Sequence, residues 1–146
     1  MDNCILCNLD PNKNPTFIKE FEHWALLINY MQPTLGSSLI VLKRHVSDFS
    51  DLTEKEHLEY FNIAKQFEKV TKDSFGSNKF NYFMLANVVE HVHYHVVPRY
   101  REKVFFDGLS WKDNNYGKSL TLSSNEKSHK ILIPIIKKIQ GGFNKP

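Results

Sequence analysis

The sequence predicts an α+β domain built on a mostly antiparallel five-stranded sheet, with one long helix and a C-terminal helix. Two observations support this fold class. The elements follow in the order strand-strand-strand-helix-strand-strand-helix, and one long amphipathic segment separates the two groups of strands. With 146 residues, 41% of them hydrophobic and 24% charged, the chain suits one globular domain. We therefore expect a single domain over residues 1–146, with its core over 1–100 and a C-terminal loop and helix over 101–146.

Five short segments have the composition of strands. Ser38–Leu42 is apolar enough to be buried on both faces of a sheet. Pro98 is expected to end the last strand, because proline has no N–H to donate to a ladder. The predicted strands are Phe17–Phe21, Trp24–Ile28, Ser38–Leu42, Lys79–Leu85 and Val89–Val97.

A long helix is predicted between the third and fourth strands. Thr53 and Glu56 have the spacing of a capping box, and the helix runs from there to about Phe75. Gly76 follows at a position that favours a left-handed cap. The apolar residues of the helix recur at helical spacing, and we interpret them as core rather than as a cofactor site: Leu58, Phe61, Ala64, Phe67 and Val70.

The chain after the last predicted strand differs in character. Arg99 is expected at a solvated strand end. Residues 101–124 form a long polar and aromatic loop, and loops of that length in compact domains are usually lids, binding loops or mobile segments. Ser124–Gln140 has a helical pattern that Pro134 is expected to kink or restart.

Composition and charge exclude several classes of function. The net charge of +3, without a clustered basic face, suits an anionic small molecule and not a nucleic acid. The longest apolar runs, Trp24–Ile28 and Ile131–Ile136, are far shorter than the roughly 20 residues of a bilayer span. The first residues, Met1 to Cys4, do not resemble a secretory signal, so a cytoplasmic location is expected.

Three histidines alternate with apolar residues in the last predicted strand. On a strand, His91, His93 and His95 would project from one face, with neighbouring Cα atoms about 6.5–7 Å apart. At least one ring should then be neutral near pH 7, as a nucleophile or as a metal ligand. The spacing alone leaves these two interpretations open.

The two cysteines of the chain, Cys4 and Cys7, form a C-x-x-C pair. Without a signal peptide, such a pair indicates half a zinc site or a redox pair and not a structural disulfide. Because no thioredoxin-like pattern surrounds the pair, we favour zinc.

The alternating histidines and the following Val96-Val97 closely resemble the signature of the histidine triad (HIT) family of nucleotide hydrolases and transferases. That signature is His-φ-His-φ-His-φ-φ, where φ is an apolar residue. The resemblance covers residues 4–99 and implies a HIT-like fold. The upstream features that carry it are Asn29, similar to a ribose-contacting residue, the strand segment Gly36–Leu42, the following His45, and the pair Cys4 and Cys7.

The resemblance implies a catalytic role for two of the histidines. His93 would attack the α-phosphorus of a nucleotide and form a covalent nucleotidyl-histidine, which water then hydrolyses. His95 would hold the phosphoryl oxygens and stabilise the charge of the transition state. The third histidine is typical of the hydrolase branches, whereas the transferase branch has glutamine. The implied activity is hydrolysis of dinucleoside polyphosphates or nucleoside phosphoramidates.

The resemblance also implies a metal site. In family members with the cysteine pair, zinc is bound by the two cysteines, the histidine after the third strand and the first triad histidine. The corresponding residues are Cys4, Cys7, His45 and His91. Two thiolates and two imidazoles would form a closed tetrahedral site, which is structural and not catalytic.

Three further residues are candidates for substrate binding. Asn29 would hydrogen-bond the ribose hydroxyls. Ser37 stands where the family usually has a histidine that supports the triad, so a slower rate is expected. Asn87 precedes Val88 in a segment where many members carry a hydroxyl residue, and Asn87 is expected to contact phosphate.

These departures leave alternatives to the hydrolase open. One is a purine-nucleotide binding or regulatory protein with weak or lost catalysis, and another is an interaction module built on a zinc scaffold. The two-subunit members of the family pair through the long helix and adjoining strands, so the resemblance implies a homodimer. No nucleic-acid partner and no membrane partner are expected.

Overall fold

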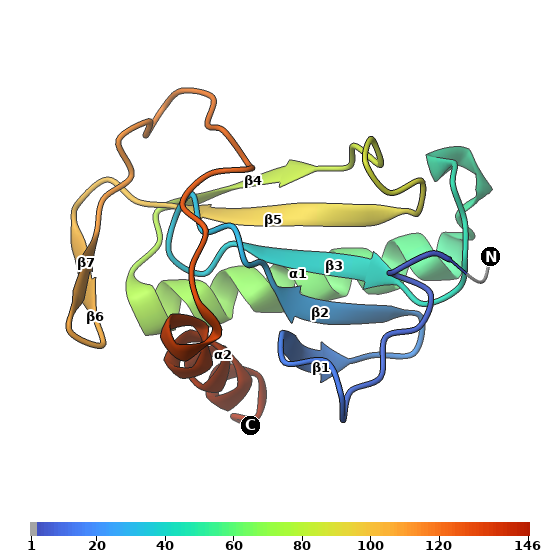
Figure 1. Ribbon diagram of the computed structural model, residues 1–146, viewed down its shortest axis with the longest axis horizontal. Coiled ribbons are helices and arrows are strands. Elements are labelled where there is room, and N and C mark those ends of the chain that lie inside the picture. Colours follow the sequence, from blue (N-terminus) through green and yellow to red (C-terminus); the bar gives the residue numbers. More distant parts are fainter. Residues whose placement is uncertain (1–2) are drawn as a thin grey trace.

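The computed structural model describes residues 3–146, and Met1 and Asp2, where no secretory signal was expected, lie outside the described residues. A five-stranded antiparallel sheet in the order β1-β2-β3-β5-β4 forms the centre of the domain (Figure 1). This confirms the predicted fold class. The strands are β1 (Phe17–Glu20), β2 (Trp24–Ile28), β3 (Ser38–Leu42), β4 (Lys79–Phe83) and β5 (His93–Arg99).

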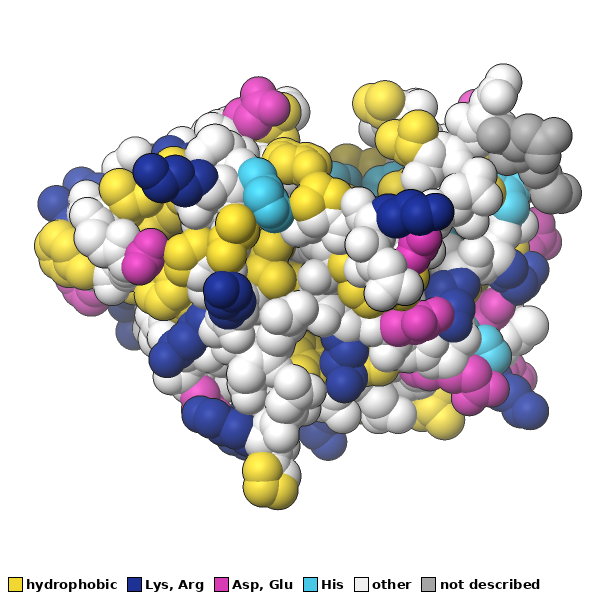
Figure 2. Space-filling view, turned by 60° about the horizontal axis from the view of Figure 1, so that its bottom comes forward, with side chains coloured by type: hydrophobic (Ala, Val, Ile, Leu, Met, Phe, Trp, Pro, Cys, Tyr) yellow, Lys and Arg dark blue, Asp and Glu magenta, His cyan; other side chains and the backbone are white. Residues whose placement is uncertain are grey.

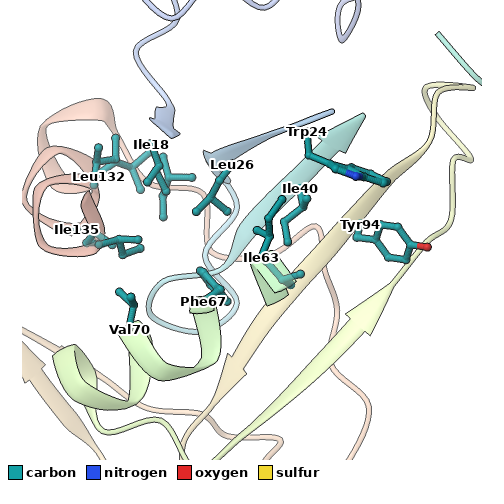
Figure 3. Close-up of a cluster of buried hydrophobic side chains, with 14 of the residues drawn as sticks. Ile18, Trp24, Leu26, Ile40, Ile63, Phe67, Val70, Tyr94, Leu132 and Ile135 are labelled. Atoms are coloured by element: carbon teal, nitrogen blue, oxygen red, sulfur yellow. The ribbon is translucent and has the colours of Figure 1, made fainter. Parts of the chain in front are cut away.

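One face of the sheet is covered by the two helices, α1 (Glu54–Phe75) and α2 (His129–Phe143) (Figure 1). Side chains from alternate strand positions meet the helices there, as Figure 3 shows for Leu26, Ile40 and Tyr94. The Tyr94 ring stacks on Tyr60 of α1 at a centroid distance of 3.8 Å. Leu132 of α2 belongs to the same core, so the C-terminal helix completes the apolar layer.

The opposite face of the sheet carries the catalytic candidates. Val41 lies opposite His93 and Leu39 opposite His95 in the β3–β5 register. Directly opposite residues project from the same side of a sheet, so both histidines face away from the helices. We call this side the histidine face.

Helix α1 begins and ends as the sequence predicts. The Thr53 side chain accepts a hydrogen bond from the Glu56 N–H, the Glu56 carboxylate accepts one from the Thr53 N–H, and Gly76 adopts a φ of 75°. The predicted apolar stripe is wrong in its first half, because Leu58 is 62% exposed and Phe61 59% exposed. In a helix with 3.6 residues per turn, residues spaced by three do not stay on one face, because each step shifts the side chain by about 60° around the helix axis. The buried stripe instead follows Ile63, Phe67 and Val70.

Strand β5 differs at both ends from its predicted bounds. It begins at His93 and continues through Pro98, which lies opposite Phe80 of β4. The β3–β5 pairing ends at Val96, so the missing N–H of Pro98 falls where β3 has already turned away. On that side the Pro98 carbonyl accepts a hydrogen bond from the Thr34 hydroxyl.

The segment after β5 contains more regular structure than a loop. Strands β6 (Val104–Phe106) and β7 (Leu109–Trp111) form a hairpin whose two turn residues, Asp107 and Gly108, both have positive φ. Helix α2 starts later than expected and passes through Pro134 without ending. A short 3-10 turn, η1 (Phe49–Asp51), precedes α1.

Helix α2 packs closely on α1 at Gly142. A Cβ atom built there would lie 2.4 Å from Cγ1 of Val70, so only glycine allows this approach. Among residues 3–146, no helix combines the length and the apolar character needed to cross a bilayer.

Candidate functional site

Four potential metal ligands from distant parts of the chain meet beside the start of β5. The ligand atoms of Cys4, Cys7, His45 and His91 all lie within 4.8 Å of one another. The Nδ1 atom of His91 lies 3.5 Å from each sulfur and 3.2 Å from Nδ1 of His45. The Cys7 sulfur lies 3.2 Å from the same His45 atom. The structure thus brings together the four residues that the resemblance implied.

These distances fit a tetrahedral zinc site. With Zn–S bonds of about 2.3 Å and Zn–N bonds of about 2.0–2.1 Å, the edges of a tetrahedron are about 3.3–3.8 Å long. The Nε2 atom of His91 lies 2.6 Å from the Leu42 carbonyl oxygen, so this nitrogen donates a hydrogen bond and Nδ1 is left to ligate. Burial lowers the pKa of His91, which favours the neutral ring that metal binding requires.

His93 is held in one defined tautomer. Its Nδ1 lies 2.6 Å from the backbone carbonyl oxygen of His91, which can only accept, so Nδ1 carries the proton. In the neutral ring, Nε2 then has a free lone pair. The residue is 9% exposed, and histidine side chains lie recessed in a hollow near the upper edge of the view in Figure 2. An imidazole held in this way can act as a nucleophile when its ring is neutral.

His95 lies beside His93, with ring centroids 5.3 Å apart. Burial, with a smaller effect of the neighbouring His93, lowers the pKa of His95 to about 4. The ring is therefore neutral at pH 7. Its Nδ1 is buried without a hydrogen-bond partner among the described residues. A neutral ring can still donate one N–H to a phosphoryl oxygen.

The family model for the HIT domain matches residues 11–102. The chain belongs to the HIT family. The Protein hit of Bacillus subtilis is 28% identical to it over 117 residues, 76% of this chain and 80% of the relative. Adenosine 5'-monophosphoramidase HNT1 of Saccharomyces cerevisiae is 28% identical over 102 residues, 68% of this chain and 65% of the relative.

The fold is that of solved HIT proteins. A Zn-bound histidine triad family protein from Mycobacterium smegmatis superposes with a TM-score of 0.67 at 16% identity, covering 97% of this chain and 93% of the other. The matched HIT domain of the present chain includes the three triad histidines and His45. It leaves out the cysteine pair and everything after residue 102.

The substrate-binding candidates of this HIT protein lie at two ends of the histidine face. Asn29 follows β2, where its side chain accepts from the Met31 N–H and its backbone N–H donates to the Ser37 carbonyl. The Ser37 hydroxyl is buried and donates to the Thr34 carbonyl at 2.9 Å. The structure therefore brings Asn29 and Ser37 together, whereas Asn87 lies apart in the exposed segment before β5.

Arg99 is the polar residue of the histidine face that sequence reasoning placed wrongly. The expectation of a solvated strand end is contradicted, because the side chain is 1% exposed. Its guanidinium forms a bidentate ion pair with Asp113 and also donates to the Asn81 side chain. The missed signal is the alternation 93, 95, 97, 99, which continues the histidine face once β5 runs through Pro98.

Proposed function

We propose that this HIT protein is a nucleotidyl hydrolase that acts on the α-phosphorus of dinucleoside polyphosphates or nucleoside phosphoramidates through His93. The observation that carries the proposal is the hydrogen bond from Nδ1 of His93 to the His91 carbonyl oxygen, at 2.6 Å. This bond leaves Nε2 as the basic nitrogen and fixes the ring plane, so that the lone pair is oriented before substrate arrives.

The proposed reaction has two displacements. In the first, the Nε2 lone pair of His93 forms a bond to phosphorus while the bond to the leaving group breaks, and the leaving group keeps the electron pair and takes up a proton from solvent. In the second, water attacks the phosphorus and gives a proton to solvent, and the P–N bond returns its electrons to Nε2. His95, neutral because its pKa is about 4, donates an N–H to a phosphoryl oxygen in both steps.

The relatives support a hydrolase of this kind. One of them is named as an adenosine 5'-monophosphoramidase, and it shares 28% of its residues with this chain over 102 positions. The chemistry of a phosphoramidase, cleavage of a P–N bond at an α-phosphorus, is the chemistry proposed for His93. The third triad histidine also points to hydrolysis.

We further propose that Cys4, Cys7, His45 and His91 hold a structural zinc ion. The tetrahedral fit of their ligand atoms supports this, as does a Zn-bound protein of the same fold. Zinc would supply a cross-link between the N-terminal segment, the chain after β3 and the chain before β5. A reducing compartment such as the cytoplasm would keep both sulfurs available as thiolates.

A homodimer is proposed through α1. The first half of this helix exposes Leu58 and Phe61, one turn apart, on a side that the sheet does not cover. Two copies of such a face would bury each other's apolar surface. Tyr82 of β4 is also partly exposed, and its hydroxyl donates to Glu68 of the same helix.

A second function is favoured by three observations around the histidines. The Ser37 hydroxyl is engaged by its own turn, and the His95 Nδ1 has no partner among the described residues. Val88, which is 98% exposed, offers no hydroxyl to a leaving group. The lack of these supporting groups is expected for a nucleotide-binding or regulatory protein with weak catalysis.

Product analysis with diadenosine tetraphosphate separates the two functions. The wild type is expected to release AMP, the His93→Ala variant to release none, and the exposed His129→Ala variant to match the wild type. A pure binding protein would release no AMP in any form, while His93→Ala would keep the affinity of the wild type for AMP in a calorimetric titration.

A further inference from the structure

The segment after the β6–β7 hairpin is attached to the rest of the domain at both of its ends, to β5 at the first and to the β2–β3 connection at the second. We call residues 112–127 the C-terminal strap. Near its end, the backbone of Glu126 forms an isolated antiparallel β-bridge with that of Met31, and the Asn125 side chain donates a hydrogen bond to the Gln32 carbonyl. Figure 1 shows the strap rising beyond β4 and returning across β5 toward α2. It lies wholly outside the matched HIT domain.

Arg99 anchors the first part of the strap. In addition to the Asp113 ion pair, its Nη atoms donate to the carbonyl oxygens of Asn115 and Lys118. Together with the bond to Asn81, these contacts use all five N–H donors of the guanidinium. Arg99 therefore positions the strap and has no donor left for a phosphate.

A cleft of about 560 Å³ lies between the strap and β4. Its walls are Lys79, Asn81 and Phe83 on the sheet, and residues 117–119 on the strap. Phe83 lies directly opposite His95 in the β4–β5 register, so the cleft opens one strand away from the triad. We call it the basic cleft.

The basic cleft has an excess of positive charge. Neither Lys79 nor Lys118 has a carboxylate within 4.0 Å among the ion pairs of residues 3–146. The Lys79 ammonium lies 4.6 Å from the centroid of the Tyr116 ring, and Arg101 approaches the same ring at 5.7 Å. The Asp113 carboxylate is neutralised by Arg99. The ammonium groups of Lys79 and Lys118 would attract an anion such as a phosphate chain.

We propose that the basic cleft is the subsite for the phosphate chain of the leaving group, with Lys118 and Lys79 as its ligands. This inference rests on the proposed function. Across the sheet, the order β2-β3-β5-β4 places Asn29 and the basic cleft on opposite sides of His95. A nucleotide whose ribose contacts Asn29 and whose α-phosphorus meets the histidines would direct its leaving group toward the basic cleft. The preferred substrates are then dinucleoside polyphosphates and not phosphoramidates.

The test compares two substrates that differ only beyond the α-phosphorus. Diadenosine tetraphosphate has a long anionic leaving group. The leaving group of adenosine 5'-monophosphoramidate is a small amine that contains no phosphate. The ratio of kcat/KM for the first to that for the second should fall about tenfold in Lys118→Gln and about as much in Lys79→Gln. Lys138→Gln, an exposed lysine of α2, should keep the wild-type ratio. Equal losses on both substrates, or a ratio within twofold of the wild type, would overturn the proposal.

A binding measurement separates failure of the subsite from failure of the proposed function. Inorganic tripolyphosphate is titrated into the wild type and Lys118→Gln, and its affinity should fall about tenfold in the variant. If the wild type cleaves neither substrate while this loss is seen, the hydrolase proposal fails and the anion subsite stands. If tripolyphosphate binds both proteins equally, the subsite is rejected whatever the activity.

Discussion

The backbone carbonyl of His91 accepts the hydrogen bond that orients His93, while the side chain of the same residue lies in the Cys4–Cys7–His45 cluster. Two functions thus meet in one residue. Whatever holds the His91 ring also holds the carbonyl oxygen that selects the tautomer of His93, the proposed nucleophile. The proposed metal cluster and the proposed catalytic pair are therefore mechanically connected.

Chelation of the proposed zinc ion should lower the stability of the fold. A structural zinc ion contributes directly to folding, so excess chelator is expected to lower the unfolding temperature of the wild type by several degrees. The Cys7→Ser variant should already unfold at a lower temperature and respond little to chelator. Differential scanning calorimetry measures both effects. An unfolding temperature of the wild type that is unmoved by chelator would contradict the zinc site.

The packing of α2 on α1 predicts opposite effects for two neighbouring glycines. Gly142→Ala places a methyl group against Val70, at 2.4 Å before relaxation, and should destabilise the fold by about 1–3 kcal/mol. Gly141→Ala meets no atom within 4 Å and should stabilise it by about 0.5–1 kcal/mol through the better helix propensity of alanine. Urea denaturation of the two variants measures these differences. Equal stabilities would show that α2 does not dock as described.

Glu56 should make the fold sensitive to acid. Its carboxylate is 4% exposed and paired with Arg44, and this pairing lowers its pKa from 4.5 to about 2. The folded-state pKa is depressed, so the contribution to stability is complete above pH 4.5 and is lost as the pH falls through about 2. We expect it to be about 3 kcal/mol.

The Glu56→Gln variant tests this contribution. It should be less stable than the wild type at pH 7 and should lose less stability between pH 4.5 and pH 2. The exposed Glu54→Gln variant serves as the control and should keep the acid sensitivity of the wild type. Parallel stability curves for wild type and Glu56→Gln would show that another carboxylate is responsible.

The strap should loosen when its anchor is shortened. Lysine at position 99 keeps the charge but not the five-donor fork, so Arg99→Lys should leave part of the buried Asp113 site unpaired and cost about 3 kcal/mol. Amide hydrogen exchange over residues 113–118 should rise strongly. Lys103→Arg, at an exposed position just before β6, should leave exchange in this segment unchanged. Protection of 113–118 in Arg99→Lys equal to that of the wild type would refute the anchor.

Local sequence signals predicted the parts of the fold that depend on local physics. The capping box at Thr53 and the left-handed Gly76 were predicted because each is encoded within one helical turn. The strand Ser38–Leu42 was predicted to the residue because its apolar run is bounded by turns. The cysteine spacing predicts half of a zinc site, but the full set of four candidate ligands follows only from the resemblance, since no spacing rule links residue 7 to residue 91.

The failures share a different cause. Pro98 and Arg99 were misplaced because their environments are created by distant segments, the turn at Thr34 and the strap at Asp113. The apolar spacing predicts Leu58 and Phe61 as core because a spacing of three residues resembles the helical repeat over one or two turns. Only the position of the sheet shows where the three-residue spacing leaves the buried face of the helix.

The stereochemical course at the α-phosphorus tests the central claim most directly. The substrate is a diadenosine polyphosphate made chiral at that phosphorus with sulfur and hydrolysed in heavy-oxygen water, and the configuration of the product thiophosphate is determined. Two in-line displacements, the first by His93 and the second by water, predict retention of configuration. Inversion would mean that water attacks directly, and it would contradict the covalent role of His93.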